Sequence, residues 1–258
     1  MSRLEEAGRL RDEMRQSLGA GDYAGASTRL AAAKLALLEL GKSAEEGMMV
    51  VGQEVMELAV LLAVHTQDSS SFQRYVSQLK PYYASPRLAA QSALRPTILG
   101  LHLLFLIVEN RLADFHSELE LLSESDRARR EVAFTIALEQ NLMVGTYNEV
   151  LHAKSSMPSP EHFAFFMGRL LDTVRDTIAE CSEVSYDSLS LEAAREMMMF
   201  DTTDDLLTFI HASRASKWRV ADGRIYFDAA QQLRGREIPS VRLLTENLAY
   251  ATELERIV

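Results

Sequence analysis

The polar and apolar positions of this chain recur with the spacing of α-helices over most of its length. Leu10, Met14 and Leu18 lie four residues apart, which places them on one face of a helix. A break with two glycines follows at residues 19–22, and a second apolar set then runs from Leu30 to Leu40. The pattern predicts two helices joined by a short turn, which together form a helical hairpin.

The same helical pattern continues to about residue 147. Further helices are predicted over residues 48–66, 69–83, 89–108, 111–122 and 128–147. Pro96 lies inside the third of these, where its missing N–H and its ring predict a kink or a break. The helices follow one another as pairs without a strict sequence period. We therefore expect a divergent α-solenoid of tetratricopeptide-like helical repeats over residues 1–157.

The pattern changes after the proline-containing stretch at residues 154–163. Ser159 and Pro160 predict the start of a helix that runs to about residue 183, with the serine as N-cap and the proline in the first turn. A short helix is predicted over residues 191–200. Another helix is expected to begin in the acidic segment at residues 201–205, with Thr203 as its N-cap.

Strand signals are concentrated in one segment, residues 218–227. Two short apolar runs flank Asp222 and Gly223, a pair that is typical of hairpin turns. Helix, turn, helix and hairpin follow one another in the order of a winged helix. A last helix is predicted from Ser240, as N-cap, to Val258.

These elements predict a mainly α protein with three regions. Residues 1–157 form the helical-repeat region, and residues 158–238 hold the end of the solenoid and the winged-helix module. Residues 239–258 form a separate C-terminal helix. In a nucleic-acid-binding protein, the second helix of the winged helix enters a DNA groove. The charge of this helix therefore indicates whether the module binds nucleic acid or serves another function.

The charge distribution argues against a nucleic-acid partner. The 258 residues carry a formal net charge of -10, whereas a protein that binds phosphates needs Lys and Arg. Residues 180–258 hold nine Lys and Arg against fourteen Asp and Glu. The best case for nucleic acid rests on a few basic residues near the hairpin: Arg214, Lys217, Arg219 and Arg224.

No residue pattern points to catalysis. The six histidines show no metal-ligand spacing, and Cys181 has no flanking base, so we expect it to be a small core residue. The three methionines at residues 197–199 are likewise expected in the core. The predictions are no enzyme activity, no cofactor, no metal and no membrane partner. A single cysteine and no apolar run long enough to span a bilayer indicate a soluble intracellular protein.

Four stretches carry a resemblance to a known family: "ENRLADFHSELELL", "ALEQNLMVGTYNEVLHAK", "FAFFMGRLLDTVRDTIAECSEVSYDSLSLEAAREMMMF" and the ending "TELERIV". They resemble the PCI-domain subunits of the proteasome regulatory particle, from about Leu101 to Val258. Helical repeats followed by a winged helix and a terminal helix are the architecture of that family. The same fold in the signalosome or in translation initiation factor three is the alternative, and a nucleic-acid-binding winged helix is a third.

The resemblance implies a non-catalytic scaffold in the proteasome lid, in the cytoplasm and nucleus, that acts in ubiquitin-dependent protein degradation. It implies other lid subunits as partners, foremost the PCI subunit called non-ATPase regulatory subunit 3, with base or ubiquitin-receptor subunits as further candidates. Winged-helix modules of such subunits pair side by side, and their C-terminal helices gather into a bundle.

Two sets of residues are therefore expected to form interfaces. The hairpin contributes Trp218, Val220, Ile225, Tyr226 and Phe227. The last helix contributes an apolar stripe with steps of four and three residues, the spacing of helical bundles. Its members are Leu244, Leu248, Ala251, Leu254 and Val258. A last helix that folds back on its own domain is the alternative for this stripe.

Overall fold

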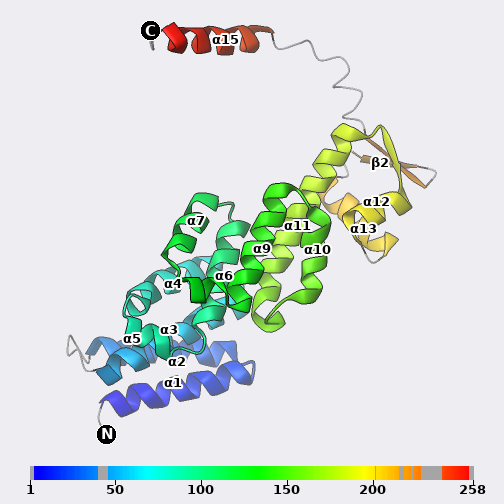
Figure 1. Cartoon of the computed structure of the whole chain (residues 1–258). Helices are drawn as coiled ribbons and strands as arrows, with labels where there is room; N and C mark the ends of the chain where they lie inside the picture. The colour runs from blue at the N-terminus through cyan, green and yellow to red at the C-terminus, as the bar shows by residue number, and fades with distance from the viewer. Residues whose placement is uncertain are drawn as a thin grey trace. The chain divides into compact units, whose positions relative to one another are not determined.

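The structure is a computed structural model, and it describes residues 3–39, 46–200, 202–214, 218–221, 223–227 and 240–255. The chain divides into two compact units, Met1–Val174 and Arg175–Val258. Figure 1 shows helices throughout the first unit and a small sheet in the second. The domain boundaries predicted near residues 157 and 238 remain predictions.

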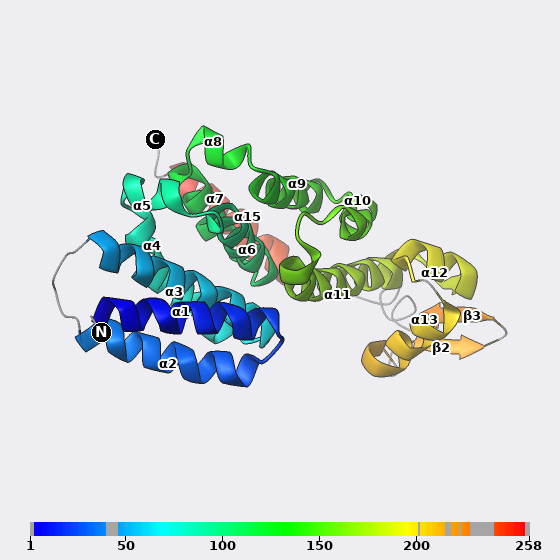
Figure 2. The same cartoon turned by 90° about the horizontal axis from the view of Figure 1, so that it is seen from below.

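The first unit consists of paired helices, as the sequence predicts. Figure 2 shows α1 and α2 side by side with α3. The elements are α1 (Arg3–Gly19), α2 (Tyr23–Glu39), α3 (Glu46–His65), α4 (Ser69–Tyr83), α5 (Pro86–Gln91), α6 (Arg95–Val108), α7 (Leu112–Leu121), α8 (Glu124–Arg127), α9 (Arg130–Val144), α10 (Tyr147–His152), the 3-10 turn η1 (Ala153–Ser156) and the first part of α11 (Pro160–Ser185).

The core of this unit, in the residues that the structure describes, includes two clusters of side chains. The first fastens the α1–α2 hairpin to α3 through Met14, Leu30 and Leu58, among other buried residues. The second joins α4, α6 and α11 through three phenylalanines whose ring centroids lie 5.0 to 5.7 Å apart: Phe72, Phe105 and Phe166. Burial of such apolar surface is the main stabilising term for stacked helix pairs.

The break predicted near Pro96 in the helix over residues 89–108 is confirmed. The structure has α5 and α6 there, separated at residues 92–94. Pro96 lies in the first turn of α6, where an N–H would have no helical partner. The break thus falls just before the proline, and the α5–α6 corner turns the chain toward α9.

A buried carboxylate joins this corner to α3 and α4. Glu57 is 3% exposed, and its Oε1 accepts hydrogen bonds from Gln53 Nε2 at 3.0 Å, Tyr83 OH at 3.0 Å and Ser92 Oγ at 2.5 Å. Burial, together with the neighbouring carboxylate, raises the pKa of the Tyr83 hydroxyl. The tyrosine therefore stays neutral and donates, which satisfies the acid inside the core.

The expectation that no apolar segment is long enough to span a bilayer is wrong by length and composition for one helical segment of the described residues, Gly47–His65 of α3. Within the protein, 72% of this segment is buried. Its apolar character is accounted for by α1, α2 and α4, which pack around it.

The second unit has the element order of a winged helix. The end of α11 leads into β1 (Ser188–Ser190), α12 (Leu191–Met198), α13 (Thr203–Phe209), the π-helical turn η2 (Ile210–Arg214), β2 (Trp218–Ala221) and β3 (Arg224–Phe227). The three antiparallel strands are ordered β1-β3-β2. The chain also contains α15 (Ser240–Glu255). The predicted mainly α fold with a small C-terminal sheet is confirmed.

Candidate assembly interface

The hairpin presents two different faces because its side chains alternate across the sheet. Trp218, Ile225 and Phe227 are 4%, 0% and 4% exposed, and they pack on the inner side. The rings of Trp218 and Phe227 meet edge to face at 5.0 Å. These three predicted interface residues therefore belong to the core of the second unit, which leaves the other face of the hairpin for a partner.

Two predicted residues of the hairpin are more accessible: Tyr226 on the outward face, and Val220 at the edge of the inner face, where it pairs with Ile225. Tyr226 is half-buried in the central strand β3, opposite Ser188 on one side and Arg219 on the other. The Arg219 guanidinium lies 5.8 Å from the Tyr226 ring centroid. Val220 is 36% exposed on β2, which is an edge strand. An edge strand offers backbone N–H and C=O groups that can pair with another chain.

The second winged-helix helix, α13, begins one residue earlier than predicted. Thr202, not Thr203, is the N-cap, and its hydroxyl accepts from the Asp205 N–H at 3.2 Å. Asp204 and Asp205 occupy the first turn, where carboxylates suit the positive end of a helix. A helix that begins with two carboxylates repels a phosphate backbone.

The basic residue that follows this helix is turned inward. Arg214 is 7% exposed, and its guanidinium reaches three carboxylates of α11. Nη2 lies 3.3 Å from Asp176 Oδ1 and 3.5 Å from Glu180 Oε1, and Nη1 lies 3.2 Å from Glu183 Oε1. Arg214 thus fastens the second helix to α11 and is not available to a nucleic acid. Lys217 lies outside the described residues.

The apolar stripe of α15 is exposed where the structure describes it. Leu244 and Leu248 are 62% and 68% exposed, and Ala251 is exposed as well. The side chain of Leu254 and the whole of Val258 lie outside the described residues. Two large aliphatic side chains one helical turn apart on one face are typical of a helix that docks against a partner.

The structure also tests the core positions predicted for Cys181 and for the three methionines at residues 197–199. Cys181 is exposed, so its assignment to the core is wrong. The neighbouring Ser182 faces inward instead, and it donates to the Ile178 carbonyl at 2.8 Å. Of the three methionines predicted in the core, Met198 is fully buried, whereas Met197 and Met199 are only half-buried. The described residues include no group of three His, Cys, Asp or Glu side chains that could hold a metal ion.

Comparison with known proteins reveals close relatives. The chain is 42% identical over 212 residues to 26S proteasome non-ATPase regulatory subunit 8 homolog A of Arabidopsis thaliana, a match that covers 81% of this chain and 79% of the relative. It is 32% identical to 26S proteasome non-ATPase regulatory subunit 8 of Caenorhabditis elegans, over 81% of this chain and 82% of the relative. It is 31% identical to 26S proteasome regulatory subunit rpn12 of Schizosaccharomyces pombe, over 80% of this chain and 82% of the relative.

The match to a protein family agrees with these relatives. Residues 93–236 match the CSN8/PSMD8/EIF3K family, and this region includes α6 to β3. The resemblance to regulatory-particle subunits that the sequence predicts is confirmed by the named relatives. The chain therefore belongs to the CSN8/PSMD8/EIF3K family, as a homologue of proteasome regulatory subunit 8.

Proposed function

We propose that the chain is a non-catalytic scaffold subunit of the 26S proteasome lid and that it acts in lid assembly. Its relatives are regulatory subunits of the 26S proteasome, and two of them are named as non-ATPase subunits. As such a subunit it has other proteasome subunits as partners and works in the soluble interior of the cell, in the cytoplasm and the nucleus. Through assembly it contributes to ubiquitin-dependent protein degradation.

The observation that carries the assembly role is the exposed stripe of α15. Leu244 and Leu248 present large apolar side chains to solvent. Exposure of this apolar surface to water is unfavourable in free energy, and docking against a partner would bury it. The steps of four and three residues along the stripe suit knobs-into-holes packing with other helices. We therefore assign residues 239–258 to assembly, residues 1–157 to a helical-repeat scaffold and residues 158–238 to the PCI domain.

The winged-helix module supplies a second contact in this proposal. Among the predicted interface residues of the hairpin, Val220 on the edge strand and Tyr226 on the outward face are the ones that a neighbouring module can reach. Strand edges give affinity through main-chain hydrogen bonds and specificity through alternate side chains. We expect the neighbour to be the PCI subunit non-ATPase regulatory subunit 3, with subunits of the base or ubiquitin receptors as further contacts.

Affinity purification of the tagged chain from native extract, with the partners identified by mass spectrometry, tests this function. We expect the complete set of lid subunits in stoichiometric amount, together with the base and the proteolytic core under conditions that keep the whole proteasome intact. Recovery of signalosome or translation-initiation subunits in place of the lid would refute the proposal.

A further inference from the structure

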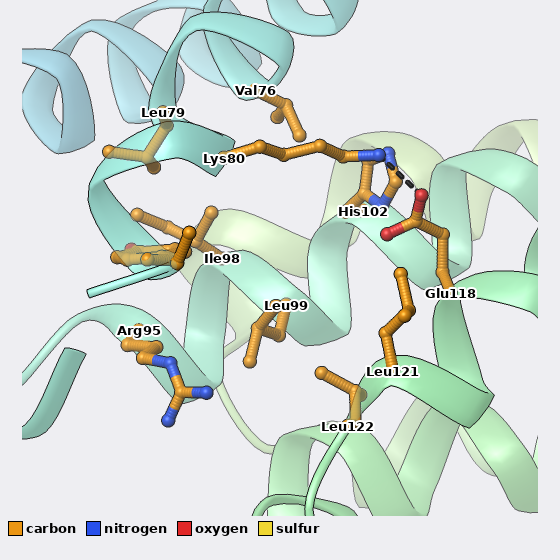
Figure 3. Close-up of a pocket in the computed structure, with 12 residues that line it drawn as sticks. Val76, Leu79, Lys80, Arg95, Ile98, Leu99, His102, Glu118, Leu121 and Leu122 are labelled. Carbon is orange, nitrogen blue, oxygen red and sulfur yellow. Dashed lines mark hydrogen bonds and ion pairs between the residues drawn. The ribbon is translucent and has the colours of Figure 1, made fainter. Parts of the chain in front are cut away.

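The first unit contains an apolar pocket that the assembly role of α15 and the hairpin does not use. It lies between α4, α6 and α7 and has a volume of about 320 Å³. Figure 3 shows its aliphatic lining, to which Leu79, Ile98 and Leu99 contribute. Leu121 stands at its mouth and is 80% exposed. This size and lining are typical of sites that accept a side chain or a small ligand.

The charged groups around the pocket neutralise one another. The Lys80 ammonium pairs with the Glu118 carboxylate between α4 and α7, as the dashed line in Figure 3 marks. At another point of the wall, the Arg95 guanidinium binds Asp126 through two hydrogen bonds, of 2.7 and 2.8 Å. A charged ligand would have to compete with these pairs, so the pocket favours a neutral one.

His102 is a polar group of the wall that can still bind a ligand, whereas the unpaired Nε of Arg95 is fully buried. Figure 3 shows its imidazole beside the ends of Lys80 and Glu118. Burial, followed by the nearby Lys80 ammonium, lowers the pKa of His102 to about 4. The ring is therefore neutral at pH 7, with one nitrogen that donates and one that accepts. Within the described residues neither nitrogen has a hydrogen-bond partner.

We propose that this pocket binds a tyrosine side chain from a partner polypeptide. The phenol ring would fill the space between Leu79, Ile98 and Leu99, and its hydroxyl would exchange a hydrogen bond with His102. A phenolic hydroxyl both donates and accepts, so it matches either tautomer of the neutral imidazole. A phenylalanine would fit the same space but would leave the imidazole unpaired.

The exposed rim indicates that the tyrosine belongs to a polypeptide and not to a free small molecule. Leu121 offers an aliphatic surface outside the pocket, where residues flanking the tyrosine can pack. Tyrosine is enriched at protein interfaces because it combines a large apolar ring with a polar tip. That the partner is another proteasome subunit rests on the proposed function, whereas the binding itself can be measured on the purified chain alone.

The test is titration of the purified full chain with Ac-Leu-Tyr-Leu-NH2, Ac-Leu-Phe-Leu-NH2 and p-cresol. The NMR resonance of the His102 ring, assigned by its loss in His102→Leu, reports binding. Ala84 lines the pocket and is exposed, so Ala84→Trp should block it. Ala128→Trp is the matched control, because Ala128 also is an exposed helix C-cap in αR conformation but lies outside the pocket.

We expect the tyrosine peptide to shift the His102 resonance with saturation in the natural chain and in Ala128→Trp. The phenylalanine peptide should bind at least about fivefold more weakly because it lacks the hydrogen bond to His102. p-Cresol should be weaker by at least a similar factor because it lacks the rim contacts. Binding should disappear in Ala84→Trp, and His102→Leu should bind both peptides equally, as followed by peptide line broadening. Equal binding of both peptides to the natural chain, p-cresol binding as tight as the tyrosine peptide, or no binding at all would overturn the proposal.

Discussion

Arg214 and Glu183 face each other inside the second unit, with Nη1 of the guanidinium 3.2 Å from Oε1 of the carboxylate. Each side chain is only 8% exposed. The same Oε1 accepts a hydrogen bond from Trp218 Nε1 at 2.8 Å. One carboxylate of α11 thus holds both the end of the second winged-helix helix and the first strand of the hairpin.

Glu183→Ala should destabilise the second unit by about 3 kcal/mol, because it leaves a buried cation and a buried indole N–H without their main partner. Trp218 is the single tryptophan of the chain, so its fluorescence during urea unfolding reports on this unit. Glu180→Ala is the control. The Glu180 side chain is 68% exposed, and its loss should cost less than about 1 kcal/mol. Equal effects of the two substitutions would show that burial does not govern this network.

Nucleic acid should bind no better than non-specifically. Arg214 is occupied by three carboxylates, and α13 begins with Asp204 and Asp205. A mobility-shift titration at about 0.15 M salt should show no complex with duplex DNA below ~1 µM protein. The prediction fails if a defined duplex binds more tightly and if changing the exposed Arg219 and Arg224 to Ala removes that binding.

Gly100→Ala should destabilise the first unit by about 1 to 3 kcal/mol. A Cβ at Gly100 would lie 2.9 Å from the backbone oxygen of Glu131, so α6 and α9 would have to move apart. Gly168→Ala is the matched control in α11, where a Cβ meets nothing within 4 Å. That substitution should stabilise the helix by about 0.5 to 1 kcal/mol. Thermal unfolding followed by circular dichroism measures both, and a neutral Gly100→Ala would contradict the close packing.

The stability of the first unit should depend on pH through His102. Its pKa falls from 6.5 in the unfolded chain to about 4 in the folded chain, mainly because it is buried. Between these values the unfolded chain binds a proton that the folded chain does not. The contribution is therefore complete above pH 6.5 and is lost as the pH falls toward 4, by an amount on the order of 3 kcal/mol.

His102→Leu should remove this part of the pH dependence, whereas His152→Leu, at an exposed position of α10, should leave it. The measurement is the free energy of unfolding in urea at several pH values from 7 to 4. Parallel pH profiles of the natural chain and His102→Leu would show that His102 is not protected from protonation.

The sequence predicts much of this fold because local signals are strong in it. The Asp-Gly pair and the flanking apolar runs predict the hairpin, and glycines and prolines predict several helix ends. Strand β1 escapes prediction because its three residues, Ser188–Ser190, are too few to show alternation. It becomes a strand only through pairing with β3, a contact more than thirty residues away in the chain.

Burial of single polar residues is the part that sequence predicts poorly. Arg214 resembles a surface cation, and only the fold brings it against Asp176 and Glu183. Cys181 and Ser182 differ by one position, about 100° around the helix, and the more polar of the two faces inward. The exposed stripe of α15, by contrast, follows from spacing alone at Leu244 and Leu248.

The double substitution Leu244→Asp, Leu248→Asp distinguishes a role of α15 in assembly from a role in the stability of the free chain. Both leucines are exposed in the free chain, so its thermal midpoint should stay within about 1 °C of the natural value. Two carboxylates in a docked apolar seam would be buried without partners, so incorporation into the lid should be lost. Thr245→Asp, at an exposed position of α15 about 120° around the helix from the centre of the stripe, is the control that should still be incorporated.

The deciding measurement is therefore the fraction of the double variant that co-migrates with the lid on native gels, taken together with its thermal midpoint as a free chain. We expect a preserved midpoint together with lost incorporation. Unchanged incorporation, or a midpoint that falls together with it, would contradict the assembly role of this helix.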